Sequence, residues 1–256
     1  MNVLACVKRV PAAAGKMTLT PDEQDIDTRF LGFTVSPHEE CAVEEAVRLI
    51  EKHGGESAVL TLGPEEAIQQ LQDAMALGVD RGILIPSDGI EWDPQATARA
   101  IVEAVGRQRD GGFEFDLLLF GNEAADSGDY QVGVRVAHAL GVPCVTGVKG
   151  IEVDDGKIRA RREASGGWDV FEVTLPAVIS VKEGINLPRY PSIPGRLKAR
   201  RKPIERIEVR RDAGGLEKQR LIVPQGQGRR VEILGHGPDA APRAVEVLKG
   251  LGVIRS

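Results

Sequence analysis

Apolar residues along the first 180 positions recur in two alternating patterns. Short, unbroken apolar runs predict strands at residues 2–7, 57–62, 82–86 and 116–120. Between them, apolar spacings of three and four predict amphipathic helices at residues 37–53, 64–77, 94–109 and 130–140. Strands that alternate with helices in this way predict an α/β fold, an open and mainly parallel sheet with helices on both faces.

The pattern changes after Pro143. Two strand-like runs at 145–153 and 157–163 flank Asp154-Asp155-Gly156, a typical hairpin turn. Further strands are predicted at 169–174 and 177–181, and then proline and basic residues replace the periodicity until a closing helix at 239–251. The chain is therefore predicted to form one α/β domain, residues 1–182, followed by an extended basic C-terminal arm, residues 183–256.

The composition excludes several classes of protein. With 42% apolar and 28% charged residues over 256 positions, the chain can bury a core. It has no apolar run of the roughly 18 to 20 residues that cross a bilayer, and no basic segment precedes the apolar start. We therefore expect a cytoplasmic protein, or a mitochondrial matrix protein if eukaryotic, that is not embedded in a membrane. The three cysteines form no CxxC pair and the four histidines lack ligand spacing, so no disulfide framework or metal site is expected.

The charge distribution indicates a partner. Between Lys182 and Arg230 the chain has fourteen Lys or Arg against five Asp or Glu, although its net charge is −5. A basic segment of this kind favours a nucleic acid or an acidic protein surface. Tyr190 is the one aromatic residue there, and proteins that bind single-stranded nucleic acids stack bases on aromatic rings. An acidic protein partner and no nucleic acid are expected; a solvated, irregular tail is the alternative.

The loop after the fourth strand is the richest candidate for ligand chemistry. Neither GxGxxG, GxxxxGK[ST] nor GxSxG occurs in the chain, which argues against a Rossmann dinucleotide site, a P-loop or an ordinary serine hydrolase. Residues 121–133 are small and polar, and Asp126 and Ser127 are good N-cap types for the next helix. Free amides there would hold a phosphate, and Asp126, Asp129 and Gln131 could bond to a ribose or base. A plain Asp/Gly turn that caps a helix is the alternative.

Five blocks of the sequence carry a family resemblance. They are residues 7–10 (VKRV), 42–49 (AVEEAVRL), 76–82 (ALGVDRG), 116–121 (DLLLFG) and 186–194 (NLPRYPSIP), the last followed by the basic run 198–202. In order and spacing the chain resembles the β subunit of electron transfer flavoproteins along nearly its whole length. The resemblance implies a flavodoxin-like or adenine-nucleotide-hydrolase-like α/β domain whose C-terminal arm embraces a homologous α subunit.

The same resemblance implies a function without catalytic residues in this chain. A redox FAD, bound chiefly by the α subunit, carries electrons from flavin dehydrogenases, such as those of fatty acid oxidation, to a quinone-linked acceptor. The β subunit usually holds an AMP of structural role. Carried over by position, the AMP contacts are Cys6, Ser36, Pro37, His38, Glu39, Leu62, Gly121, Asn122, Glu123, Ala124, Ala125, Asp126, Ser127, Gly128, Asp129, Tyr130, Gln131 and Val132.

The block around residue 190 resembles the family's recognition loop for partner dehydrogenases. In that loop an apolar residue anchors in a pocket of the partner, and Ile193 has this position; packing against Leu197 or the core is the alternative. The surrounding basic residues would steer an acidic partner. The residues implied in recognition are Pro188, Arg189, Tyr190, Ile193, Lys198, Arg200 and Arg201.

The chain also departs from the family. Ala13 and His38 stand where aromatic residues near the flavin are frequent, and residues 126–130 differ from the acidic triplet of AMP-binding mammalian-type members. In an electron-bifurcating branch a second FAD replaces AMP; Gln131-Val132-Gly133 leans toward that branch, whereas bulky Tyr130 does not. A stand-alone adenine-nucleotide-binding enzyme of similar fold is a more remote alternative.

Overall fold

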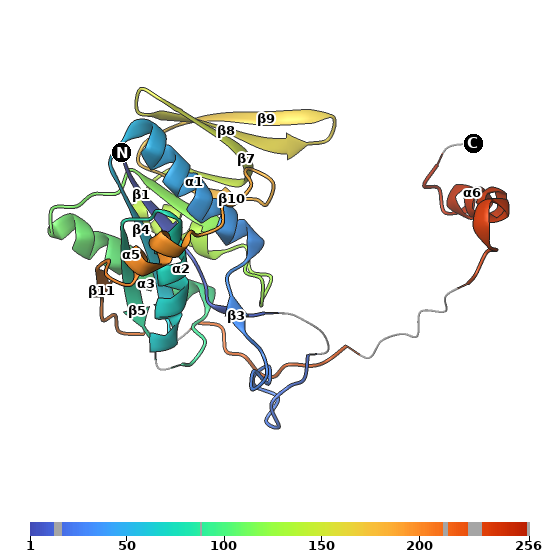
Figure 1. Cartoon of the computed structure of the whole chain (residues 1–256), viewed down its shortest axis with the longest axis horizontal. Helices are drawn as coiled ribbons and strands as arrows, with labels where there is room; N and C mark the ends of the chain where they lie inside the picture. The colour runs from blue at the N-terminus through green and yellow to red at the C-terminus, as the bar shows by residue number, and fades with distance from the viewer. Residues whose placement is uncertain (13–16, 88, 212–214, 225–231, 255–256) are drawn as a thin grey trace.

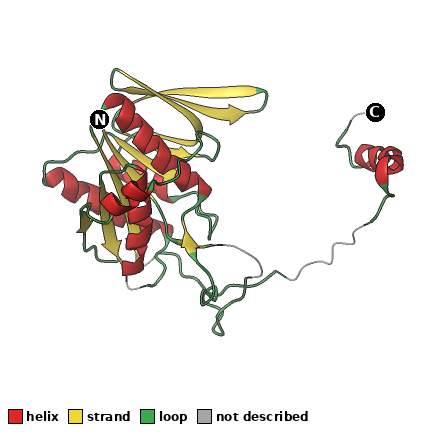
Figure 2. Ribbon diagram, in the orientation of Figure 1, coloured by secondary structure: helices red, strands yellow, loops and turns green. Residues whose placement is uncertain are grey.

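One nine-stranded sheet organises the molecule, in the order β11-β5-β4-β1-β6-β10-β7-β8-β9. The computed structural model describes residues 1–12, 17–87, 89–211, 215–224 and 232–254. The first seven strands in that order run parallel, and β8 and β9 extend β7 as an antiparallel meander that projects from the body (Figure 2). The strands of the sheet are β1 (Asn2–Cys6), β4 (Glu56–Gly63), β5 (Arg81–Pro86), β6 (Leu117–Gly121), β7 (Cys144–Asp154), β8 (Lys157–Ala164), β9 (Gly167–Thr174), β10 (Ala177–Val181) and β11 (Ile204–Arg206).

Helices cover both faces of the parallel strands (Figure 1). Side chains of α1, α2 and α5 pack on one face, and those of α3 and α4 on the other. The helices are α1 (Pro37–His53), α2 (Ile68–Leu77), α3 (Pro94–Asp110), α4 (Val132–Leu140), α5 (Ile193–Ala199) and α6 (Ala241–Gly250), with 3₁₀ turns η1 (Glu65–Ala67) and η2 (Gly237–Ala240). A separate small ribbon pairs β2 (Val10–Pro11) with β3 (Phe33–Thr34). The predicted α/β architecture is confirmed.

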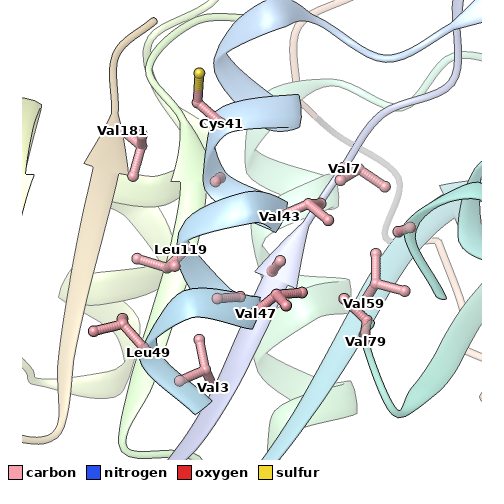
Figure 3. Packing of buried hydrophobic residues seen from close by; sticks show 14 of the residues in the cluster. Val3, Val7, Cys41, Val43, Val47, Leu49, Val59, Val79, Leu119 and Val181 are labelled. Carbon is pink, nitrogen blue, oxygen red and sulfur yellow. The ribbon is translucent and has the colours of Figure 1, made fainter. Parts of the chain in front are cut away.

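The core has two layers, one on each face of the central strands. Alternate residues of β1 point to opposite faces, as the two-residue period of a strand requires, so Val3 and Ala5 meet α1 whereas Leu4 meets α3 and α4. The central strands are apolar on both faces because helices cover both. Figure 3 shows the α1 side of this core, with Val3, Val7, Cys41, Val43, Val47, Leu49, Val59, Val79, Leu119 and Val181 labelled.

The predicted elements need several corrections. The fourth helix begins at Val132 and not at residue 130, and a 3₁₀ turn precedes α2. The closing helix is preceded by η2, so α6 itself covers only Ala241–Gly250. The predicted hairpin turn is confirmed: Asp155 and Gly156 both have positive φ, which the tight turn between β7 and β8 requires.

The expectation of no periodic structure between residues 183 and 239 is wrong in one region. Helix α5 packs on α2, and β11 adds a parallel strand to the edge of β5. Gly195 allows the close approach of α5, because a Cβ there would lie 2.6 Å from the carbonyl oxygen of Ala76. The first part of the predicted arm therefore packs on the sheet. In contrast, α6 lies away from the sheet and has no buried residue (Figure 1).

No helix within the described ranges is long and apolar enough to cross a membrane. Among the same residues, no group of three or more His, Cys, Asp or Glu side chains is arranged to hold a metal ion.

Candidate functional site

The chain changes direction across the sheet between β1 and β6. From β1 it moves to β4 and β5 on one side, and then returns through α3 to place β6 on the other side of β1. Ligands of open parallel sheets bind beyond the carboxyl ends of the strands at such a switch point. Cys6 pairs with Leu60 of β4 and Phe120 of β6, so Cys6, Leu62 and Gly121 all lie at this edge.

The start of α1 closes one side of the crevice. Ser36 caps the helix: its hydroxyl accepts from the Glu39 amide, and the Glu39 carboxylate accepts from the Ser36 amide. The other carboxylate oxygen of Glu39 accepts from the Lys8 amide at 2.9 Å, which joins the end of β1 to α1. A Cβ at Gly121 would lie 2.7 Å from Glu39 Cγ, so only glycine lets β6 pass this close. The structure thus places Ser36, Glu39 and Gly121, which the family resemblance implied, side by side at this edge of the sheet.

The buried carboxyl of Glu39 predicts a pH dependence. Burial raises its pKa to about 7 from 4.5, against the opposing hydrogen bonds from Ser36 and Lys8. Between these values the native state holds a proton that the unfolded chain has lost, so the contribution of Glu39 to stability falls as pH rises through this window. We expect the free energy of unfolding of the wild type to fall relative to that of Glu39→Gln by about 3 kcal/mol between pH 4.5 and 7.

Urea unfolding of both chains at half-unit pH steps measures this difference. Glutamine accepts only one of the two amide hydrogen bonds, but that loss is the same at every pH and leaves the slope unchanged. Parallel pH profiles for the two chains would contradict the prediction.

The β6–α4 loop, residues 122–131, closes the other side of the crevice. Its start is fixed by the Asn122 amide, which donates to the Val181 carbonyl of β10. Its tip is a turn in which the Gly128 amide donates to Ala124, with Gly128 at φ +67°. The prediction that Asp126 or Ser127 caps the next helix is wrong, because Gln131 occupies the N-cap of α4 and its side chain makes no capping hydrogen bond. The first amides of α4 are therefore left without a side-chain cap, as an anion site requires.

The polar side chains of this loop bond to neighbours within it and beside it. Gln131 donates to Asp129 at 3.0 Å and accepts from Arg135. Asp126 accepts from the ammonium group of Lys8 at 2.7 Å. A ribose or base that bonds to these side chains would therefore have to displace the hydrogen bonds and the ion pair that they make here.

Lys8 was not predicted as a site residue, yet it lies at the centre of the crevice edge. Its ammonium group contacts Asp126 and also Glu91, at 3.2 Å, in the segment that follows β5. Glu91 in turn contacts Lys218 of the C-terminal arm at 3.3 Å, and Lys218 contacts Asp25. A basic residue directly after a buried strand was the available signal, since the carboxyl end of a strand is where ligands bind.

His38 connects the crevice to the segment after β10. Its Nδ1 accepts from the Glu183 amide at 2.7 Å, and its Nε2 lies 3.5 Å from a carboxylate oxygen of Glu123. The hydroxyl of Tyr130 and then His38 lower the pKa of Glu123. Cys6, by contrast, is a buried thiol whose pKa is raised by burial, so it is a packing residue at the crevice floor. The other residue that departs from the family, Ala13, lies outside the described residues.

Residues 187–197, which we name the docking segment, present apolar side chains to solvent. Leu187, Tyr190 and Ile193 are 90%, 96% and 77% exposed. Ile193 therefore does not pack in the core. Lys198, Arg200 and Arg201 are exposed at the end of α5, next to the same surface. The guanidinium of Arg189 is instead engaged by Glu44 and Glu51 of α1.

Comparison with known proteins gives one consistent family. Residues 26–212 match the family model described as "Electron transfer flavoprotein domain". The chain is 36% identical over 212 residues to "Electron transfer flavoprotein subunit beta" of Bacillus subtilis, covering 82% of this chain and 79% of that protein. It is 38% identical over 205 residues to the protein of the same name from Syntrophomonas wolfei, covering 80% and 78%, and 33% identical over 209 residues to that of Mycobacterium tuberculosis, covering 79% and 77%. The chain belongs to the electron transfer flavoprotein family and is one of its β subunits.

Proposed function

We propose that this chain pairs with an electron transfer flavoprotein α subunit and serves, in that heterodimer, to carry electrons from flavin dehydrogenases to a quinone-linked acceptor. The observation that carries the proposal is the family match over residues 26–212, which includes both the β6–α4 loop and the docking segment. The redox FAD is held chiefly by the α subunit and supplies the electron-transfer chemistry. This chain contributes a docking surface and has no substrate turnover of its own.

We further propose that the crevice between β1 and β6 holds AMP in a structural role. The residues at that edge fit an adenine nucleotide: the N-cap residue of α4 makes no side-chain capping bond, and Lys8 brings a positive charge to Asp126 of the loop that precedes α4. Backbone groups of the β6–α4 loop would hold the phosphate, and the ends of β1 and β4 would line the adenine. Bound there, the nucleotide braces α1, α4 and the loop against one another.

A second FAD in this crevice is the alternative that the ending Gln131-Val132-Gly133 favours. The glycine at position 133 is, however, explained by packing. A Cβ at this position would lie 3.1 Å from Ser180 Oγ and 3.2 Å from the Phe120 ring, so glycine lets α4 approach β6 and β10. Gly133 therefore does not favour a flavin over AMP.

Mass spectrometry of the nucleotides that acid releases from the purified heterodimer tests the proposal. We expect one FAD and one AMP per heterodimer. Two FAD and no AMP would instead place a redox flavin in this chain, and the absence of any adenine nucleotide beyond one FAD would contradict the proposed site. Conversion of a substrate by this chain without the α subunit would favour the stand-alone enzyme.

A further inference from the structure

One side of α1 holds the chain that leads into the docking segment. His38 accepts from the Glu183 amide, Asn186 donates to the Cys41 carbonyl at 3.0 Å, and Asn186 also donates to Glu45 at 2.9 Å. These α1 positions are three or four residues apart, so they lie along one side of the helix. Residues 183–189 therefore run along α1 and are tied to it at several points.

Arg189 makes the strongest of these ties. Its Nε and Nη2 donate to the two oxygens of Glu44 at 2.9 and 3.0 Å, and its Nη1 and Nη2 donate to the two oxygens of Glu51 at 2.6 and 2.9 Å. Its backbone amide also donates to Glu44, at 3.1 Å. One guanidinium thus bridges two carboxylates that lie about two helical turns apart, with the bidentate geometry that arginine allows and lysine does not.

The burial of Glu44 is what holds Arg189 in place. The Glu44 side chain is 5% exposed, whereas that of Arg189 is 35% exposed. A buried carboxylate needs its cation, because an unpaired charge away from water is costly. The two carboxylates raise the pKa of the guanidinium, which keeps its charge at every physiological pH. Arg189 is therefore held against α1, one residue before the exposed ring of Tyr190.

We propose that Arg189 is a positioning residue: by bridging Glu44 and Glu51 it fixes the base of the docking segment, so that Tyr190 and Ile193 project from the surface already arranged for the partner. The proposal rests on the function proposed above, in which this segment meets flavin dehydrogenases. A surface loop that is ordered before encounter avoids the entropy cost of being ordered on binding. The charge of Arg189 is neutralised by α1 and does not contribute to steering.

Arg189→Lys separates positioning from steering, because lysine retains the positive charge but cannot make bidentate hydrogen bonds to both carboxylates. The assay uses the purified heterodimer as electron acceptor for a purified flavin dehydrogenase of fatty acid oxidation from the same organism, reduced by its own substrate. We expect the KM for the heterodimer to rise roughly tenfold with kcat unchanged, and the salt dependence of kcat/KM to keep its wild-type slope. Hydrogen exchange of the backbone amides of Leu187, Arg189, Tyr190, Ser192 and Ile193 should become faster in the same heterodimer.

A matched control is Arg107→Lys, since Arg107 makes an exposed surface pair with Glu103 on the opposite face of the sheet. This variant should leave KM and exchange unchanged. Glu51→Gln is the second test variant; Glu51 is exposed, so the fold is retained while half of the bridge is lost, and we expect a roughly threefold rise in KM. Wild-type KM and exchange in both Arg189→Lys and Glu51→Gln would overturn the proposal.

Two further variants distinguish this proposal from the function on which it rests. If Arg189→Gln lowers kcat/KM and flattens its salt dependence while Arg189→Lys behaves as wild type, Arg189 is a steering charge and the positioning role is wrong. If Ile193→Ala leaves KM unchanged, or the wild-type heterodimer accepts no electrons from the dehydrogenase, the proposed docking function itself fails. If Ile193→Ala raises KM tenfold while Arg189→Lys has the wild-type KM, the positioning role of Arg189 is wrong and the proposed docking function stands.

Discussion

Replacing Gly121 by alanine is expected to lower the free energy of unfolding by about 3 kcal/mol and, if the crevice holds AMP as proposed above, to release that AMP from the purified heterodimer. The new Cβ would lie 2.7 Å from Glu39 Cγ, 3.2 Å from the Glu39 amide nitrogen and 3.3 Å from His38 Cβ. These atoms belong to the first turn of α1, whose capping box and bond to Lys8 fix the crevice. The first turn of α1 must therefore move away from β6, and the crevice opens.

Gly106→Ala is the matched control for this substitution. Gly106 lies within α3 and has no other atom within 4 Å of its Cβ position, so alanine there should be neutral or raise the stability by up to about 1 kcal/mol. Urea unfolding and nucleotide content measure both variants. A Gly121→Ala heterodimer with wild-type stability and a full complement of AMP would show that neither α1 nor the nucleotide depends on this contact.

A chain that ends at Val223 is expected to bind the α subunit about a hundredfold more weakly. Helix α6 has no buried residue, and it and the residues after it expose Val245, Val247, Leu248, Leu251 and Val253. Burying three such side chains against a partner is worth about 1.5 kcal/mol each, and ordering the arm cancels part of that gain. Titration of the α subunit with the full-length and shortened chains, followed by calorimetry, measures the change.

The cut at Val223 preserves the contacts of the arm with the body. The Leu221 amide still donates to Glu23, and Lys218 still pairs with Asp25 and Glu91. The unfolding midpoint of the shortened chain alone should therefore equal that of the full chain. Equal affinities for the α subunit would contradict an embracing role for α6.

Hydrophobic periodicity predicted the elements that bury one face or two. In strands β1, β4, β5 and β6 and in helices α1 to α3 the spacing of apolar residues fits one kind of element only, and the bounds are close to those predicted. The two-residue strands β2 and β3 were not predicted. Helix α5 and β11 escaped because their burial depends on a few residues, such as Ala199 and Ile204, among many basic neighbours. Ser192 followed by Pro194 was a usable sign, since serine caps α5 and proline occupies its first turn.

Strand order could not be read from the pattern. Strand β10 follows β9 in the chain but lies between β6 and β7 in the sheet, and this position brings Val181 beside Asn122. The loop and helix residues of the crevice were predicted through family resemblance, whereas Lys8, Glu91 and Lys218 were not, because they are brought together by three separate parts of the chain. The bridge of Arg189 was hidden for the same reason: nothing local connects residue 189 to residues 44 and 51.

The short strand β11 affects whether the chain aggregates while it is being synthesised. It pairs Ile204, Glu205 and Arg206 with β5, and the Gly82 amide also donates to the Pro203 carbonyl. Until these residues emerge, the apolar β5 has an open edge, and an open edge is a template for pairing with another chain. A chain broken off within residues 187–197 is therefore expected to aggregate, whereas one that ends at Val223 keeps its sheet edge covered.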